Sequence, residues 1–468
     1  MSGWGRLRGG VLLLATTLLG CGDARPLDMP AGAAGSGGGA SGQAGASGAG
    51  ASAGAGGDPT TPDGTVTPRP PECGCAPGPG IDLLACGSDW LPNTLRDAPE
   101  AVVTPDGATV VFNRCVASAA GGCRPGVFRW VRGAGVVTTA PDAWAFAVSA
   151  NGTTTLAARV DGDAPFLLDA DGTARALPLT RAYARLLSAD GTTVVARAET
   201  SIGITEVVRW TAAAGATALG DLAGGPTYSE PTAINAGASV IVGYGNTVRG
   251  QEPFLWTQAS GMTGLGILPS QVVQTVARAA SADGTVVVGS GLSDTGNAIF
   301  RWTLSGGMQG IAYIFSNVPL GGPMSYFSVW SPPLLVSSDG AVVAGTAAQP
   351  SNPMVPLAFR WTPSAGLEPL SSAPASIVRA ASADGRRIAG STLASGAPPG
   401  MAFAALPYQA FLFEDGIGTR PLADALAGVD LGGMTLGDPI AISADGSTLV
   451  GHATCAGTAA IFRASLPQ

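Results

Sequence analysis

Short apolar runs and small polar turns alternate along the chain between residues 104 and 446, and the pattern repeats eight times. Each unit has a small apolar run, a turn usually spelled Ser-Ala-Asp-Gly, a valine-rich run, and then Phe-Arg-Trp or a variant of it. The turns begin at Thr104, Ser149, Ser188, Asn235, Ser281, Ser337, Ser382 and Ser443. Such a period is typical of propellers and solenoids, because one unit of this length cannot bury its own apolar face.

The fifth unit shows how one repeat is expected to fold. Asp283-Gly284 supplies the positive φ of a tight hairpin, so residues 276–281 and 285–289 are predicted to pair as antiparallel strands. In the next run, residues 298–302, strand alternation puts Phe and Trp on one face and Arg on the other. A short fourth strand follows at residues 307–311. Four short strands per unit predict an all-β protein in which each unit is a blade of a β-propeller; a β-helix would have shorter, more uniform repeats.

The number of repeats predicts about eight blades, or seven if the weak second unit does not form a full blade. The eighth unit has three strands, the last at Ile461-Phe462-Arg463, and the sequence ends at Gln468. Because a propeller leaves no long edge uncovered, another segment is expected to supply the fourth strand. The stretch Ile81–Trp90, or Leu91–Leu95 after it, precedes the first unit and is the expected donor.

Three phrases carry a resemblance to a known family. They are Ala279–Gly289, which reads Ala-Ala-Ser-Ala-Asp-Gly-Thr-Val-Val-Val-Gly, then Phe300-Arg301-Trp302-Thr303, and Leu219-Gly220-Asp221-Leu222. They resemble the HAF family of bacterial extracellular repeats, across residues 100–468 and most strongly in units 3 to 6. The resemblance implies an extracellular repeat protein and brings no catalytic residues. Unit 4 departs from the pattern because it lacks the Asp, and unit 7 because Phe411-Leu412-Phe413 replaces Phe-Arg-Trp.

The N-terminus resembles a bacterial lipoprotein signal peptide. Arg6 and Arg8 precede the apolar run Val11–Leu19, which has the length of a signal peptide rather than of a membrane span. Leu18-Leu19-Gly20-Cys21 resembles a lipobox, in which the cysteine, Cys21, is lipidated and becomes the mature N-terminus. Gly22 follows where the inner-membrane retention signal has Asp, so we expect lipid anchoring at the outer membrane or cell surface. An ordinary signal peptide with an incidental cysteine is the alternative.

These features divide the chain into a signal peptide (1–20), a lipid-anchored flexible linker (21–72) and a propeller domain (73–468). Within the linker, Ala31–Gly57 is almost only Gly, Ala and Ser, and such a tract cannot bury enough surface to offset its backbone entropy. The Thr- and Pro-rich stretch Pro59–Pro71 is a stiffer spacer. The Gly-x-Ser-x-Gly match Gly50–Gly54 has neither a strand before it nor a helix after it, so we interpret it as chance.

Composition excludes several kinds of chemistry. The sequence contains no Lys, which excludes a P-loop, a Schiff base and a Ser-Lys pair. The net charge of −8 argues against a nucleic-acid partner, since that affinity depends on neutralising phosphates. His452 is the single histidine, so a histidine-based zinc cluster is excluded and a Ser-His-Asp triad would have to use it. Because His452 ends a valine-rich run with no nucleophile motif nearby, we interpret it as structural, and no cofactor is expected.

Six cysteines remain once Cys21 is set aside for the lipid, and an even number in an exported protein predicts three disulfides. They are Cys73, Cys75, Cys86, Cys115, Cys123 and Cys455. Cys115 and Cys123 flank one hairpin loop and are the expected first pair. A bond from Cys455 to Cys86 or Cys75 would join the two ends of the ring. Cys73-Gly74-Cys75 is not interpreted as a metal site, because zinc-binding thiolates usually have about two to four residues between them.

The repeated Asp-Gly turns also raise a calcium alternative. Asp161, Asp163, Asp169 and Asp171 cluster in unit 2, but the further acidic positions and the closing Glu of a calcium loop are missing. Asp tolerates the left-handed conformation and bonds its own backbone, so we interpret the turns as structural and keep calcium as the weaker alternative. The Arg of Phe-Arg-Trp is expected to pair with a turn Asp of its own or the next blade, or to face water.

Three functions fit this sequence. A surface-displayed, non-catalytic module that binds or scaffolds a protein or glycan is favoured, because no catalytic motif is found in the sequence. The alternatives are a hydrolase or lyase with acidic residues converging in the propeller channel, and a purely structural envelope protein. The longest insertions, Tyr313–Pro333 and Ala394–Tyr408, are apolar and poor in acid-base groups. The first contains Tyr326, Phe327 and Trp330, which form a candidate contact surface unless they pack under the blade rim. We expect a monomer.

Overall fold

The computed structural model divides the chain into two compact units, Met1–Gly64 and Thr65–Gln468. The structure describes residues 74–87, 98–117, 123–160, 164–179, 181–270, 273–294, 296–315, 334–349, 352–373, 375–393 and 408–467, all in the second unit. The predicted signal peptide, Cys21, Cys73 and the Gly/Ala/Ser-rich linker therefore lie outside the described residues. Among the residues described, no helix is both long and apolar enough to cross a membrane.

The described strands fall into eight groups of four, and we call each group a blade. Blade 1 contains β2 (Ala101–Val103), β3 (Thr109–Ala117), β4 (Cys123–Val131) and β5 (Gly135–Pro141); blade 2 contains β6 (Ala143–Val148), β7 (Thr154–Arg159), β8 (Pro165–Asp169) and β9 (Ala174–Ala176). Blade 3 contains β10 (Tyr183–Leu187), β11 (Thr193–Ser201), β12 (Ile204–Thr211) and β13 (Gly215–Ala218); blade 4 contains β14 (Gly224–Ile234), β15 (Val240–Thr247), β16 (Gly250–Thr257) and β17 (Gly261–Gly264).

The second half of the chain repeats this plan. Blade 5 contains β18 (Val273–Ala280), β19 (Val286–Ser293), β20 (Gly296–Thr303) and β21 (Gly307–Phe315); blade 6 contains β22 (Leu335–Val336), β23 (Val343–Gln349), β24 (Asn352–Thr362) and β25 (Gly366–Pro369). Blade 7 contains β26 (Ser376–Ala381), β27 (Arg387–Leu393), β28 (Tyr408–Glu414) and β29 (Gly418–Pro421); blade 8 contains β30 (Met434–Ile442), β31 (Thr448–Cys455), β32 (Thr458–Ser465) and β1 (Ile81–Cys86).

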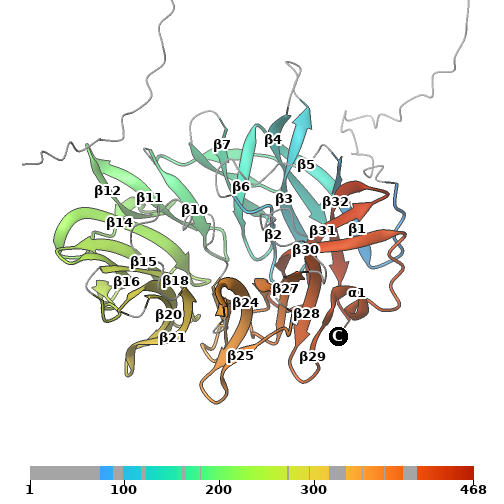
Figure 1. Ribbon diagram of the computed structural model, residues 1–468. Coiled ribbons are helices and arrows are strands. Elements are labelled where there is room, and N and C mark those ends of the chain that lie inside the picture. Colours follow the sequence, from blue (N-terminus) through green and yellow to red (C-terminus); the bar gives the residue numbers. More distant parts are fainter. Residues whose placement is uncertain are drawn as a thin grey trace, which may run out of the picture. The chain divides into compact units, whose positions relative to one another are not determined.

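Within each blade the strands pair antiparallel, and the blades follow one another around a ring (Figure 1). Blades 3, 4 and 5 share one sheet, because β12 meets β14 and β16 meets β18 through short parallel contacts. First strands of neighbouring blades contact each other at seven of the junctions, and between blades 6 and 7 β23 contacts β26. Blade 8 contacts blade 1 through β30 and β2. The first strands thus form the inner wall of the ring, which confirms the predicted all-β propeller.

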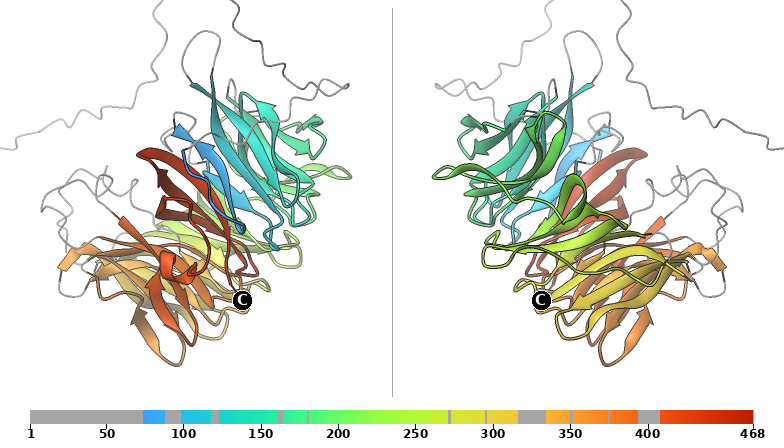
Figure 2. Two further views of the ribbon diagram at one scale, coloured as in Figure 1. Left: turned by 90° about the vertical axis from the view of Figure 1, so that its right-hand side faces the viewer. Right: turned by 90° about the vertical axis from the view of Figure 1, so that its left-hand side faces the viewer.

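Strand β1 completes blade 8. It pairs antiparallel with β32, from Ile81 opposite Ala464 to Cys86 opposite Ala460, so the two ends of the described chain lie side by side (Figure 2). This strand lies in the first of the two expected donor segments; the second, Leu91–Leu95, lies outside the described residues. A disulfide between Cys75 and Cys455 joins the same two ends, with Cα atoms 5.4 Å apart.

Two further cysteines, Cys86 and Cys115, are also disulfide-bonded. The bond between Cys75 and Cys455 is one of the two pairings expected for Cys455, whereas a bond between Cys115 and Cys123 stays a prediction. The closure of the ring therefore rests on strand pairing and on one covalent link between residues 380 positions apart.

The recurring turn is held by its own side chains. In blade 5 the Ser281 hydroxyl donates to Asp283 Oδ1 over 2.7 Å and accepts the N–H of Val286 over 3.0 Å, while Asp283 Oδ1 accepts the N–H of Thr285. The same bonds recur in the turns that begin at Thr104, Ser188, Ser337, Ser382 and Ser443. Asp and Ser are therefore used at these positions because they satisfy local backbone donors.

The turn glycine is required for two reasons. Its φ is positive, +73° at Gly284 and +71° at Gly340, a region that side chains with a Cβ disfavour. A Cβ on Gly340 would also lie 2.4 Å from Cγ2 of Val286 in the preceding blade. Blade 4 departs from the pattern, with the buried Ala238 at this position and a φ of +48°. The turn glycine thus lets neighbouring blades approach closely.

Neighbouring turns also bond to each other. The N–H of the second turn residue donates to the carbonyl of its counterpart in the next blade, over 2.6 to 2.9 Å, from Ala150 to Ala189, Ala189 to Ala236, Ala282 to Ser338, Ser338 to Ala383 and Ala383 to Ala444. The amide of Asn235 links blade 4 to Ala282 of blade 5, and the N–H of Asp445 links blade 8 to Pro105 of blade 1. The turns therefore meet at one end of the inner wall, which we call the turn side. We call the opposite end, where the second strand leads to the third and the fourth to the next blade, the loop side.

The Arg of Phe-Arg-Trp joins consecutive blades. Guanidinium carbons lie 5.4 Å (Arg301 to Trp361), 5.7 Å (Arg360 to Phe413) and 4.8 Å (Arg463 to Trp130) from ring centroids of the next blade. A cation over an aromatic face is attracted by the ring quadrupole. The ion pairs of Arg360 are with Glu368 and Asp415, and that of Arg463 is with Asp82. Asp415 lies in the turn between β28 and β29, so Arg360 pairs with a turn Asp of the next blade, one of the expected alternatives, whereas Asp82 lies in a strand.

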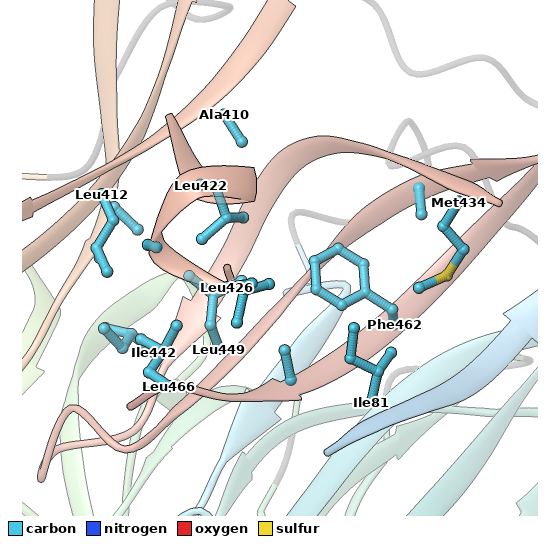
Figure 3. Close-up of a cluster of buried hydrophobic side chains, with 14 of the residues drawn as sticks. Ile81, Ala410, Leu412, Leu422, Leu426, Met434, Ile442, Leu449, Phe462 and Leu466 are labelled. Carbon is cyan, nitrogen blue, oxygen red and sulfur yellow. The ribbon is translucent and has the colours of Figure 1, made fainter. Parts of the chain in front are cut away.

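Apolar clusters fill the spaces between blades. The cluster between blades 7 and 8 contains Leu412 of blade 7 and Leu449 and Phe462 of blade 8 (Figure 3). The short helix α1 (Leu422–Ala425) adds Leu422 to this cluster, and β1 adds Ile81. The donated strand is thus held by burial as well as by pairing.

Candidate functional site

Most of the strands of the inner wall carry a β-bulge three residues before the turn. The residues that the pairing skips are Phe146, Arg185, Thr232, Arg278, Arg379 and Ile440. A bulge locally re-aims its side chain, and its equal distance from the turn in these six blades puts the six side chains at one level of the wall. Three of the six are arginine, although the whole chain has a net charge of −8. Blades 3, 5 and 7 thus each place an arginine at this level of the inner wall.

Side chains from blades 3, 4 and 5 meet around two of these arginines. We call this set the inner-wall cluster, and it consists of Tyr183, Arg185, Arg197, Tyr228, Glu230, Tyr244 and Arg278. Each lies at least three residues from its turn, which places it about 10 Å or more toward the loop side at about 3.3 Å per residue. The cluster joins segments nearly a hundred residues apart, from Tyr183 to Arg278, so it exists only when three consecutive blades are assembled.

An ion pair between two blades lies at the centre of the cluster. Arg197 of β11 places Nη1 2.6 Å from Glu230 Oε2 of β14, and the Tyr228 hydroxyl donates to the same carboxylate oxygen over 2.8 Å. Arg197 also lies 3.2 Å from the Tyr228 hydroxyl oxygen. The carboxylate of Glu230 is thus oriented by a cation and a phenol, and its side chain keeps 14% of its surface exposed.

Aromatic rings hold the second arginine in place. The Arg185 guanidinium carbon lies 3.8 Å from the centroid of Tyr183 and 5.3 Å from that of Phe146 in blade 2. The Arg197 guanidinium carbon lies 5.2 Å from the Tyr183 centroid. Two cations therefore lie close to one ring, whose quadrupole attracts both.

Tyr244 and Arg278 complete the cluster. The rings of Tyr228 and Tyr244 have centroids 6.1 Å apart. Burial, together with a hydrogen bond to Tyr228, raises the pKa of Tyr244, so this phenol stays protonated at neutral pH. Arg278 is exposed to solvent, yet desolvation by the surrounding protein lowers the pKa of its guanidinium. The charge interaction with Tyr244 raises this pKa, but by less. An arginine that water reaches but protein partly surrounds is a suitable donor for an anion.

The inner wall of blades 7, 8 and 1 carries separate polar contacts. Arg379 lies 2.7 Å from Asp438 of the next blade, and the Ser391 hydroxyl donates to the same carboxylate. His452 Nε2 lies 2.7 Å from Glu100 Oε2 across the junction of blades 8 and 1. Position for position, His452 corresponds to Arg197 and Tyr244, which also face the next blade. This place fits the structural role expected for His452.

The acidic residues considered for calcium are partly described. Asp169 pairs with Arg175 over 2.9 Å, and Asp171 accepts the N–H of Thr173; Asp161 and Asp163 lie outside the described residues. Within the described ranges, no group of three or more His, Cys, Asp and Glu side chains is arranged to hold a metal ion.

The structure and the sequence point to different candidate surfaces. Tyr326, Phe327 and Trp330 lie outside the described residues, so that contact surface stays a prediction. The inner-wall cluster was missed in the sequence, because its members come from separate units and assemble only in the ring. One signal was present: an arginine stands three residues before the turn in units 3, 5 and 7, as Arg185, Arg278 and Arg379.

No protein-family model and no curated protein matches the sequence. Similar solved structures include dipeptidyl peptidase 4 of Porphyromonas gingivalis, at 12% identity and a TM-score of 0.45, with 70% of this chain and 52% of that chain covered. An oligogalacturonate lyase in complex with manganese is similar at 10% identity and a TM-score of 0.43, over 83% of this chain and 93% of that one. The β-propeller domain of the trilobed protease of Pyrococcus furiosus is similar at 10% identity and a TM-score of 0.41, with 69% of this chain and 98% of that chain covered.

These likenesses concern the fold alone, and the chain spans about half the length of the peptidase chain that it matches. The class that the fold defines is the β-propeller.

Proposed function

We propose that the protein is a lipid-anchored, surface-displayed lipoprotein whose propeller is a non-catalytic module that binds a glycan or a protein. The apolar run before Cys21, the Gly/Ala/Ser-rich linker and the resemblance to HAF extracellular repeats support the envelope placement. Such a linker leaves the propeller tethered away from the membrane, where the loop side can meet a partner.

The inner-wall cluster is the observation that carries the binding role. It combines hydroxyl and guanidinium donors with aromatic rings on a rigid wall, and it includes the solvent-exposed Arg278. Polar groups fixed on strands are preorganised, so little conformational entropy is lost when a ligand binds.

The main alternative is a hydrolase or lyase with an acidic site in the propeller channel. Such a site needs carboxylates that are available for proton transfer. Two described inner-wall acids are engaged instead: Glu230 by Arg197 and Tyr228, and Asp438 by Arg379 and Ser391. Their engagement favours binding over acid-base catalysis.

Thermal unfolding of the full chain, exported through an oxidising compartment, tests the proposed function. The panel contains envelope glycans, peptidoglycan fragments, envelope proteins, calcium and a chelator. A ligand that binds only the native state raises the unfolding midpoint. The proposal predicts a rise with one glycan or protein, no turnover of that ligand, and loss of the rise in Arg278→Gln. Turnover of the ligand would establish an enzyme, and no rise with any member would leave the structural alternative.

A further inference from the structure

We propose that the inner-wall cluster binds an acidic glycan, that is, a saccharide whose sugars carry carboxylate groups. This inference rests on the proposed function, because it names the ligand class of the same site.

The donors of the cluster suit a carboxylate. Arg278 presents a planar guanidinium on the exposed wall of blade 5, and Arg185 presents another from the equivalent bulge of blade 3. Guanidinium groups bind carboxylates through parallel N–H bonds, and these bonds strengthen where water is partly excluded. The protonated Tyr244 hydroxyl lies in the same group. Its proton is shared with Tyr228, so a carboxylate that reaches Arg278 lies beside a neutral phenol rather than an anion.

The acceptors of the cluster narrow the ligand further. Glu230 stands between Tyr228 and Arg197 and keeps part of its surface exposed. A carboxylate next to the site repels a ligand that is anionic throughout, such as phosphate or a run of acidic side chains. It attracts hydroxyl donors, and a uronic acid places hydroxyls and a carboxylate on one ring. The mixture of guanidinium donors with a carboxylate acceptor thus fits a hydroxylated anion.

Ionised carboxylates mark the turn side of the inner wall. At the turn side, Asp106, Asp190, Asp283, Asp339, Asp384 and Asp445 have lowered pKa values, so all six stay ionised at neutral pH. The bulge arginines lie farther from the turns, toward the loop side. The ionised turn carboxylates and the bulge arginines thus occupy different levels of the inner wall, and an anion that reaches Arg278 binds away from the turns.

Isothermal titration of the full chain with alginate-derived uronate oligomers tests this inference. The comparison ligands are the same oligomers with their carboxyl groups reduced to alcohols, and polyglutamate of similar charge. The variants are Arg278→Gln and, as a matched control, Arg249→Gln, which removes an equal charge from the exposed hairpin between β15 and β16. Unfolding midpoints and circular dichroism establish that both variants fold.

The proposal predicts that only the uronate oligomers bind, with an affinity that falls as salt rises. Arg278→Gln weakens binding roughly tenfold to a hundredfold, the usual effect of losing a charge-assisted hydrogen bond, while Arg249→Gln leaves it unchanged. Equal binding of the reduced oligomers would overturn the acidic-glycan inference and keep the binding function. Tighter binding of polyglutamate would reassign the site to an acidic peptide. Absence of uronate binding would overturn the inference, and the thermal panel would then decide the proposed function separately.

Discussion

Two glycines of blade 6 allow the close approach of neighbouring blades to be measured. Gly340 and Gly366 have the same backbone angle, φ +71°, so an alanine at either position bears the same left-handed strain, about 1–2 kcal/mol. They differ in their surroundings. A Cβ on Gly340 would lie 2.4 Å from Cγ2 and 2.9 Å from Cβ of Val286 in blade 5, whereas a Cβ on Gly366 meets no atom within 4 Å.

The expected losses of stability follow from this difference. Gly366→Ala should lower the free energy of unfolding by about 1 kcal/mol, since the smaller entropy of the unfolded alanine chain offsets part of the strain. Gly340→Ala bears the same cost and must also push Val286 or the blade away, which adds about 1–3 kcal/mol for an overpacked contact. We therefore expect a total loss of about 2–4 kcal/mol for Gly340→Ala.

Urea unfolding at fixed temperature measures both variants against the wild type. Tryptophan fluorescence and far-ultraviolet circular dichroism should give coincident transitions, which justifies comparing free energies. Losses that agree within about 0.5 kcal/mol would refute the reasoning, because the contact between blades would then contribute nothing measurable.

Three further perturbations test the ring. The double variant Cys75→Ser with Cys455→Ser removes a link across 380 positions. We expect the free energy of unfolding in urea to fall by about 2–4 kcal/mol, less than the value of about 6 kcal/mol from chain entropy alone. An unchanged urea midpoint would contradict closure of the ring by this bond. The hydrogen bonds from the Ser337 hydroxyl and the Ala341 N–H lower the pKa of Asp339 below 3.8, so the carboxylate stabilises the fold at pH 5 and loses this effect as the pH falls below about 4. In Asp339→Asn the drop in unfolding midpoint between pH 5 and pH 3 should therefore be smaller than in the wild type. Equal drops in the two proteins would exclude this account. Arg301→Gln removes the cation over Trp361, so it should lower the free energy of unfolding by about 1 kcal/mol and alter tryptophan fluorescence. Arg175→Gln breaks an exposed ion pair and should lower the free energy of unfolding by less. The reverse order would argue against stacking between blades.

The repeat made most of the fold predictable. Asp283-Gly284 fixed the hairpin because few residues adopt positive φ, and the same signal marked nearly every blade. The donor strand β1 was expected because a propeller leaves no uncovered edge, and pairing with β32 bears this out. These features depend on local chain geometry or on closure, and both can be read along one sequence.

Contacts between blades were harder to predict. The stack of Arg301 on Trp361 joins residues of different units, and a single sequence does not say whether an arginine meets an acid or a ring across that distance. The inner-wall cluster has the same difficulty, since Arg197, Glu230 and Arg278 meet only when three blades assemble. A regular position for an arginine three residues before the turn was visible, but its side chain is aimed by a bulge that the sequence pattern does not reveal.

A crystal structure of the full chain grown with the uronate oligomers tests the central claim most directly, because it locates the ligand. The account predicts a saccharide at the loop side of the inner wall, with a carboxylate bonded to Arg278 and hydroxyls near Glu230 and Tyr244. A saccharide bound at the turn side or on an outer strand, with the inner-wall cluster unoccupied, would contradict it.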